Sequence, residues 1–144
     1  MFATYEDVTV GATASFGEYE MTREEILTFA QQYDPQPFHT DEAAAEQSMF
    51  GGLVASGWHT AAVTMRLVVA GLLEDSGSMG AVGVDELRWP NPVRPGDVLS
   101  IEAEIVDKEP WREGVGVVPT RIVTTKADGE VAQTYVGRVL YPME

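Results

Sequence analysis

The segment 57–73 restricts the possible folds more than any other part of this chain of 144 residues. Its residue pattern is helical, and Ser56 directly before it is a residue type that caps helix N-termini. A helix that is apolar on every side is normally buried on every side, so the rest of the chain must enclose this one. Its apolar residues, which point in almost all directions, are Ala61, Ala62, Val63, Met65, Leu67, Val68, Val69, Leu72 and Leu73.

The second half of the chain has the residue pattern of β-strands. Apolar and polar side chains alternate over 99–105, and 114–126 is rich in Val, Thr and Ile. Asp128-Gly129 is a hairpin turn sequence, after which 130–141 provides the returning strand. A further strand is expected at 14–20. We therefore predict an α+β domain in which an antiparallel sheet packs on the long helix.

A shorter helix is expected before the long one. Thr22 followed by Glu25 has the spacing of a capping box, which marks a helix start. Pro35 ends this helix, because the residue before a proline is disfavoured in the helical conformation. Asp34 is therefore expected at the helix end and His39 in the loop beyond it.

The charge and composition exclude several classes of protein. With 9 Lys and Arg against 23 Asp and Glu, the net charge of −14 argues against a nucleic-acid partner, which would require a basic face. The absence of cysteine excludes disulfides, zinc–thiolate sites and cysteine nucleophiles. The apolar run 63–73 is interrupted by Arg66 and is too short to cross a bilayer. With no signal-peptide pattern at the N-terminus, we expect a cytoplasmic protein without a membrane partner.

Three residues form a set suited to acid–base chemistry on a carbonyl compound. Asp34 and His39 lie five positions apart on a proline-rich loop, and Gly57 begins the long helix 18 residues later. A carboxylate and an imidazole can exchange protons with a shared water. The start of a helix offers unpaired N–H groups and the positive end of a dipole to a developing oxyanion.

Each of these residues also has an ordinary structural explanation. Asp34 could be a turn residue at a helix end, and Gly57 could serve helix–sheet packing alone. His59, the second of the two histidines, is expected to be a packing or capping residue. Asp41 and Glu42 beside His39 are better explained by the start of a short helix than by a metal site, so neither a metal nor a cofactor is expected.

Three sequence blocks resemble the MaoC-like dehydratase and (R)-specific enoyl-CoA hydratase family. They are Asp-Pro-Gln-Pro-Phe-His at 34–39, Leu-Val-Ala-Ser-Gly-Trp at 53–58 and the block 87–97 with its Trp-Pro-Asn-Pro-Val-Arg-Pro-Gly-Asp sequence. Gln36 stands where the family commonly has asparagine. The resemblance implies a hot-dog fold over 1–144, in which an antiparallel sheet wraps around one long helix.

The resemblance also implies roles for individual residues. Asp34 and His39 would be the catalytic acid–base pair, with Asp34 provisionally the base, and the Gly57 N–H would donate to the thioester oxygen. Contacts to the substrate are expected from the neighbours of Gly57 in the sequence and from two arginines that could meet the coenzyme A phosphates. These substrate-binding candidates are Ser56, Trp58, Arg88 and Arg94.

The expected activity is the reversible hydration of a 2-enoyl-CoA to the (R)-3-hydroxyacyl-CoA, as in fatty acid metabolism. The expected assembly is a homodimer or a dimer-based higher oligomer with the acyl-CoA along the subunit interface. Two other functions stay open at this point. One is a hot-dog acyl-CoA thioesterase, and the other is a non-catalytic acyl-CoA-binding subunit.

Overall fold

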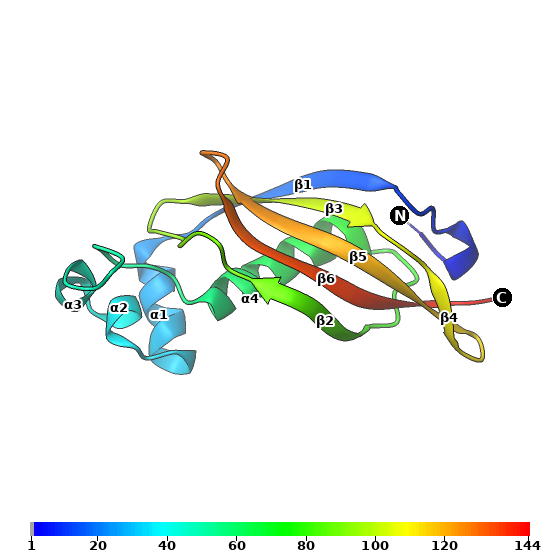
Figure 1. Ribbon diagram of the computed structural model, residues 1–144, viewed down its shortest axis with the longest axis horizontal. Helices are drawn as coiled ribbons and strands as arrows, with labels where there is room; N and C mark the ends of the chain where they lie inside the picture. The colour runs from blue at the N-terminus through cyan, green and yellow to red at the C-terminus, as the bar shows by residue number, and fades with distance from the viewer. Residues whose placement is uncertain (1) are drawn as a thin grey trace.

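A computed structural model describes residues 2–144, which form a six-stranded antiparallel sheet curved around one long helix (Figure 1). The predicted α+β class and the enclosure of a long helix by an antiparallel sheet are confirmed. The strands follow one another across the sheet in the order β1 (Thr13–Glu20), β3 (Val98–Ile105), β5 (Val115–Lys126), β6 (Val131–Pro142) and β2 (Ala81–Arg88), and β4 (Glu109–Arg112) pairs with β5.

The long helix α4 (Gly57–Val68) continues directly into a π-helical turn, η2 (Val69–Leu73). Its inner side packs on β3, β5 and β6, so that Leu67 shares one core with Leu99 and Ile122. A buried hydrogen bond of 2.7 Å between the Thr64 and Thr124 hydroxyls ties the helix to the sheet within this core. The sheet therefore fixes both the position and the rotation of α4.

The prediction that this helix is buried on every side is wrong. Met65 and Val69 are 45% and 43% exposed, and Ala62, three residues before Met65, is also exposed. The sheet ends at β2, which pairs only with β6, so the covering layer stops before it closes around the helix. On β2 itself, Val82 and Val84 are likewise exposed.

Three helices lie together at one end of the molecule: α1 (Arg23–Tyr33), α2 (Pro37–Thr40) and α3 (Glu42–Glu46) (Figure 1). Thr22 caps α1 as predicted, by accepting a hydrogen bond from the Glu25 N–H. The reciprocal half of the capping box is not formed, because the Glu25 carboxylate instead accepts the Tyr19 hydroxyl at 2.8 Å. His39 lies in α2 and not in a loop, since Pro37 begins a helical turn.

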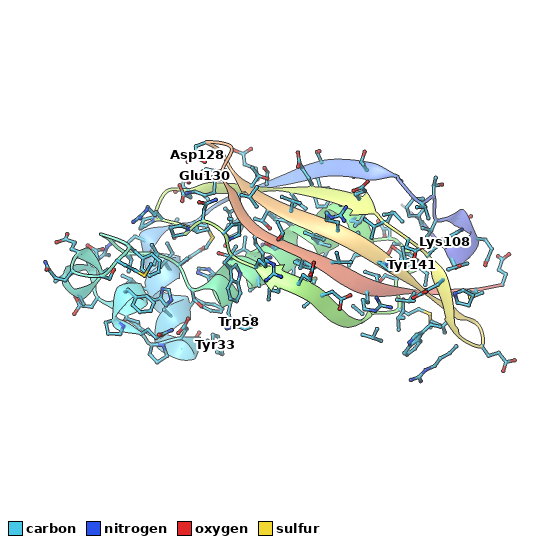
Figure 2. The ribbon with its side chains drawn as sticks, in the orientation of Figure 1. Tyr33, Trp58, Lys108, Asp128, Glu130 and Tyr141 are labelled. Carbon is cyan, nitrogen blue, oxygen red and sulfur yellow. The ribbon has the colours of Figure 1, made fainter. Side chains whose placement is uncertain are left out.

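The opposite end of the molecule is closed by the first residues of the chain. The turn η1 (Tyr5–Asp7) packs on β5, and a second small core contains Val8, Ile105 and Tyr141. Tyr141 is labelled at this end in Figure 2. Strand β4 was not predicted, because its four residues are all exposed and include a proline. Among residues 2–144, no helix combines the length and the hydropathy needed to cross a bilayer.

Candidate active site

A cavity of about 650 Å³ opens between the helical end of the molecule and the start of α4. Its walls come from the end of α1, from α2, from the first residues of α4 and from the segment 89–94 that follows β2. Five of the predicted site residues line it, namely Asp34, His39, Gly57, Trp58 and Arg94. Residues from four separate parts of the sequence are thus brought to one cavity.

Asp34 and His39 face one another in this cavity. The Asp34 Oδ2 and His39 Nε2 atoms are 3.4 Å apart, and the side chains are only 16% and 8% exposed. The contact follows from two prolines: Pro35 ends α1 at Tyr33, and Pro37 begins the single turn that carries His39. Both side chains are therefore set on short, stiff backbone.

The hydrogen bonds of His39 define its tautomer. Nδ1 lies 2.6 Å from the carbonyl oxygen of Val54, and a carbonyl can only accept, so Nδ1 carries the proton. In the neutral ring, Nε2 is then the unprotonated nitrogen, and it faces Asp34. The pair consequently presents a carboxylate oxygen and a basic nitrogen side by side.

The environment of Asp34 favours its charged form. Burial raises the pKa of this carboxyl, but hydrogen bonding by Gln36 and Ser56 and the nearby His39 outweigh burial and hold the pKa below its ordinary value. The Gln36 Nε2 donates to Asp34 Oδ1 at 2.6 Å. The partial burial of Asp34 would by itself make it a stronger base, yet this effect is overridden.

Gly57 is held in close contact with an aromatic ring. A Cβ atom at this position would lie 2.5 Å from the indole of Trp89, so only glycine fits without movement. Trp89 is fixed in turn by the hydrogen bond from its Nε1 to Gln133 Oε1, 2.8 Å long. Gly57 is also the first residue of α4, so its N–H lies at the positive end of the helix dipole and on the cavity wall.

The four predicted substrate-binding residues have different positions. Trp58 lines the cavity and meets the Trp89 ring edge-on, with ring centroids 5.1 Å apart. Arg94 lines it too, and its Nη2 donates to the Phe50 carbonyl at 2.7 Å. Ser56 is fully buried and caps α4 through the Trp58 N–H. Arg88 lies outside the cavity wall, exposed beside Glu86.

Sequence reasoning missed several residues that shape this site. Gln36 was noted only as a departure from a family pattern, although it holds Asp34. The roles of the Val54 carbonyl and of Gln133 have no sequence signal, because both arise from contacts between distant segments. Among residues 2–144, no three His, Asp or Glu side chains gather in the way a metal ion would need.

His59 lies on the side of α4 away from the acid–base pair, where it faces a second, open hollow beside α1. Its ring stacks on Phe29 with centroids 4.7 Å apart and an angle of 7° between planes. Its Nδ1 is buried without a hydrogen-bond partner within the described chain. Burial lowers the pKa of His59, and the opposing effect of Glu25 is smaller. The packing role predicted for this residue agrees with these contacts.

The chain resembles known proteins both in its sequence and in its fold. Residues 7–127 match the family described as MaoC like domain. A 3-hydroxybutyryl-CoA dehydratase from Methylorubrum extorquens is 31% identical over 110 residues, which is 75% of this chain and 67% of that protein.

Two solved structures share the whole architecture. The MaoC-like dehydratase from Rhodospirillum rubrum is 42% identical with a TM-score of 0.90, covering 98% of this chain and 97% of that one. The (R)-hydratase from A. caviae involved in PHA biosynthesis is 25% identical with a TM-score of 0.71, covering 96% and 99%. These neighbours show that the sheet and helix described above form the hot-dog fold.

We expect Gly57→Ala to destabilise the protein. The added methyl would overlap the Trp89 ring, and such overpacking costs about 1–3 kcal/mol, which exceeds the gain of about 1 kcal/mol that alanine brings to a helix. Thermal unfolding and near-ultraviolet circular dichroism of the tryptophans measure the effect. Gly52→Ala is the control, because a Cβ there meets only the end of the Arg94 side chain, at an ordinary contact distance of 3.5 Å. Equal stability of the two variants would contradict the contact.

We also expect His59 to make stability pH-dependent. Because its pKa is lowered in the folded state, the unfolded chain binds the proton first as the pH falls below the ordinary value of 6.5. The free energy of unfolding should therefore decline from that pH downward, by about 1.4 kcal/mol for each unit of lowering. His59→Phe keeps a ring against Phe29 without a titrating group, so it should lose less stability between pH 7.5 and 5 in urea titrations. An identical loss in both proteins would rule out this origin.

Proposed function

The chain belongs to the MaoC-like dehydratase family, and from this membership we propose that it reversibly hydrates a 2-enoyl-CoA to the (R)-3-hydroxyacyl-CoA. The family match covers residues 7–127 and includes both the acid–base pair and the start of α4. The observation that carries the proposal is the 3.4 Å approach of Asp34 and His39 in a cavity that Gly57, the first residue of α4, also lines.

The pair can hold and activate one water. The two acceptor atoms, Asp34 Oδ2 and His39 Nε2, lie side by side, so a water between them can donate one hydrogen to each. As its oxygen bonds to the β-carbon, His39 Nε2 takes one proton and Asp34 stabilises the imidazolium. The pair then delivers a proton to the α-carbon, which balances the addition of water across the double bond.

The lowered pKa of Asp34 favours His39 as the base. A carboxylate with a pKa below its ordinary value is a weak proton acceptor, whereas an imidazole as a class titrates near neutrality. The provisional assignment of Asp34 as the base is therefore replaced in this proposal. Asp34 instead orients the water and supplies the negative charge that an imidazolium needs.

The start of α4 would stabilise the thioester oxygen. Electron density moves onto this oxygen when the β-carbon is attacked, and the Gly57 N–H at the helix start lies on the same cavity wall as the pair. One such donor contributes about 3–4 kcal/mol to a transition state. Arg94 on this wall is the better placed of the two arginines for a coenzyme A phosphate, since Arg88 lies outside the cavity.

The proposed assembly is a homodimer formed through β2. This strand has an unpaired edge, and the exposed Val82 and Val84 lie on it. If the β2 edges of two copies paired, the two sheets would form one continuous sheet. The exposed Val82 and Val84 of each copy would be covered by the same contact. The bare side of α4, with Met65 and Val69, offers further apolar surface for the same contact.

The decisive test mixes the purified protein with crotonyl-CoA and follows the loss of the conjugated enoyl absorbance. His39→Ala and Asp34→Asn should each lower kcat by about 100- to 10,000-fold, the usual contribution of a general acid–base group. A thiol reagent in parallel detects free coenzyme A. Release of coenzyme A without hydration would assign a thioesterase, and binding without turnover on short, long and branched thioesters would assign a binding subunit.

Val84→Glu should convert a dimer into a monomer. A carboxylate at this half-exposed position would become buried and unpaired on assembly, which is unfavourable. Light scattering after size-exclusion chromatography measures the mass, against 15.7 kDa for one chain. Val10→Glu is the control, because Val10 is 50% exposed and lies away from β2. A wild-type monomer, or a dimer that survives Val84→Glu, would refute this interface.

A further inference from the structure

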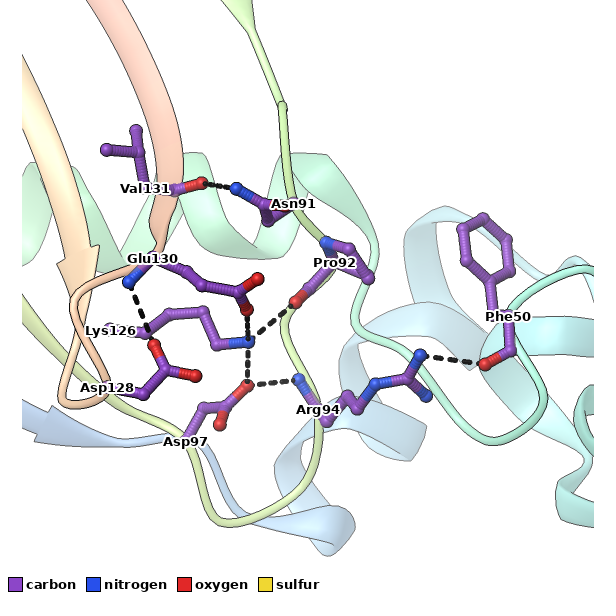
Figure 3. A network of polar contacts seen from close by, with 9 residues as sticks. All are labelled: Phe50, Asn91, Pro92, Arg94, Asp97, Lys126, Asp128, Glu130 and Val131. Atoms are coloured by element: carbon purple, nitrogen blue, oxygen red, sulfur yellow. Dashed lines mark hydrogen bonds and ion pairs between the residues drawn. The ribbon is translucent and has the colours of Figure 1, made fainter.

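A buried ammonium group lies behind the wall of the candidate active site. Lys126, the last residue of β5, has a side chain that is only 6% exposed. Its Nζ is 3.1 Å from Asp97 Oδ2 and 3.0 Å from Glu130 Oε1, and it donates to the Pro92 carbonyl at 3.2 Å (Figure 3). The three donors of the ammonium therefore have three oxygen acceptors.

The group remains charged in this setting. Burial lowers the pKa of Lys126, but hydrogen bonds and charges from Glu130 and Asp97 outweigh burial and leave the pKa above its ordinary value. Although the chain has a net charge of −14 and therefore many carboxylates, this lysine pairs with two from different segments, Asp97 and Glu130. It joins the hairpin after β5 to the segment between β2 and β3.

Residues 89–94 of the segment that it holds, 89–97, form one wall of the cavity. Asp97 Oδ2 also accepts the Arg94 N–H at 2.7 Å, which closes the turn in the segment, and the Asn91 amide donates to the Val131 carbonyl at 2.9 Å (Figure 3). The wall is therefore attached at both of its ends to the β5–β6 hairpin. Lys126 reaches both the Pro92 carbonyl and Asp97.

The wall in turn holds the groups proposed to do the chemistry. The Val93 carbonyl accepts the Ala55 N–H at 2.8 Å, two residues before Gly57. On the other side of the same short segment, the Val54 carbonyl accepts the His39 Nδ1 proton at 2.6 Å. An uninterrupted series of contacts thus runs from the ammonium to the imidazole and to the start of α4.

We propose that Lys126 is a positioning residue for this site: by fixing the segment 89–97, it sets where the His39 ring and the start of α4 lie relative to each other. Lys126 touches no substrate itself. The expected effect of Lys126 on turnover rests on the proposed function, whereas its expected effect on the position of the His39 ring does not. Displacement of a reacting group by about 1 Å can cost up to about 100-fold in rate.

The test compares Lys126→Met with Arg121→Met. Arg121 lies on β5, as Lys126 does, and forms an ion pair of 2.8 Å with Glu104, but its side chain is exposed. Its removal therefore controls for the loss of a charge and an ion pair. Lys126→Met should lower kcat for crotonyl-CoA by about tenfold or more in protein shown to be folded, while Arg121→Met leaves kcat unchanged. If the single variant does not fold, Lys126→Met with Asp97→Asn repeats the test without a charge on the more buried of the two partner carboxylates, since Glu130 is 50% exposed.

A second measurement does not depend on activity. The chain has 2 histidines, so the ring signals of His39 and His59 are readily told apart by nuclear magnetic resonance. Lys126→Met should shift the Nδ1–H signal of His39 and leave His59 unchanged. If wild-type protein hydrates no enoyl-CoA, the proposed function fails and this shift alone decides the positioning role. A lower melting temperature with unchanged kcat and unchanged His39 signals would overturn the proposal and leave Lys126 a stabilising residue only.

Discussion

The burial of α4 against the curved sheet is the constraint on which the rest of the structure depends. The shared core of Leu67, Leu99 and Ile122 and the Thr64–Thr124 hydrogen bond fix the helix in place. Because α4 is fixed along its length, its N-terminus is fixed too, and this N-terminus lies at the cavity wall instead of in solvent. The site therefore obtains an oriented amide group from the main packing contact of the fold, and α1 and α2 need only bring a carboxylate and an imidazole to it.

The fold and the identity of the central residues could be predicted because their signals are local. Alternation over 99–105, the Asp-Gly turn after β5 and Pro35 at the end of α1 each act through neighbouring residues, and each has its expected effect. The residues implied by the family resemblance could be named equally well from the sequence, since Asp34, His39 and Gly57 lie in recognisable blocks. Their meeting in one cavity is the part of the candidate site that the sequence anticipated.

What could not be predicted depends on contacts between distant segments or on the extent of the sheet. The Trp89–Gln133 hydrogen bond joins residues 44 positions apart, and no pattern in the sequence indicates it. Asp34 is partly buried, yet the direction of its pKa follows from Gln36 and Ser56, whose orientation a sequence does not give. The apolar character of α4 was read correctly, but a pattern reports only that a surface is apolar and not which chain covers it.

The two ends of the chain meet on the side of the molecule away from the cavity. The Glu144 N–H donates to the Glu6 carboxylate at 2.9 Å, and the Phe2 carbonyl accepts the Gly77 N–H. In Figure 1 this end lies opposite the helices that carry the acid–base pair. Residues 2–7 and Glu144 therefore pack at the end of the fold opposite the candidate site. A circular permutant joined by a short linker and opened at the exposed turn 113–114 would leave the β5–β6 hairpin, with Lys126 and Glu130, uninterrupted.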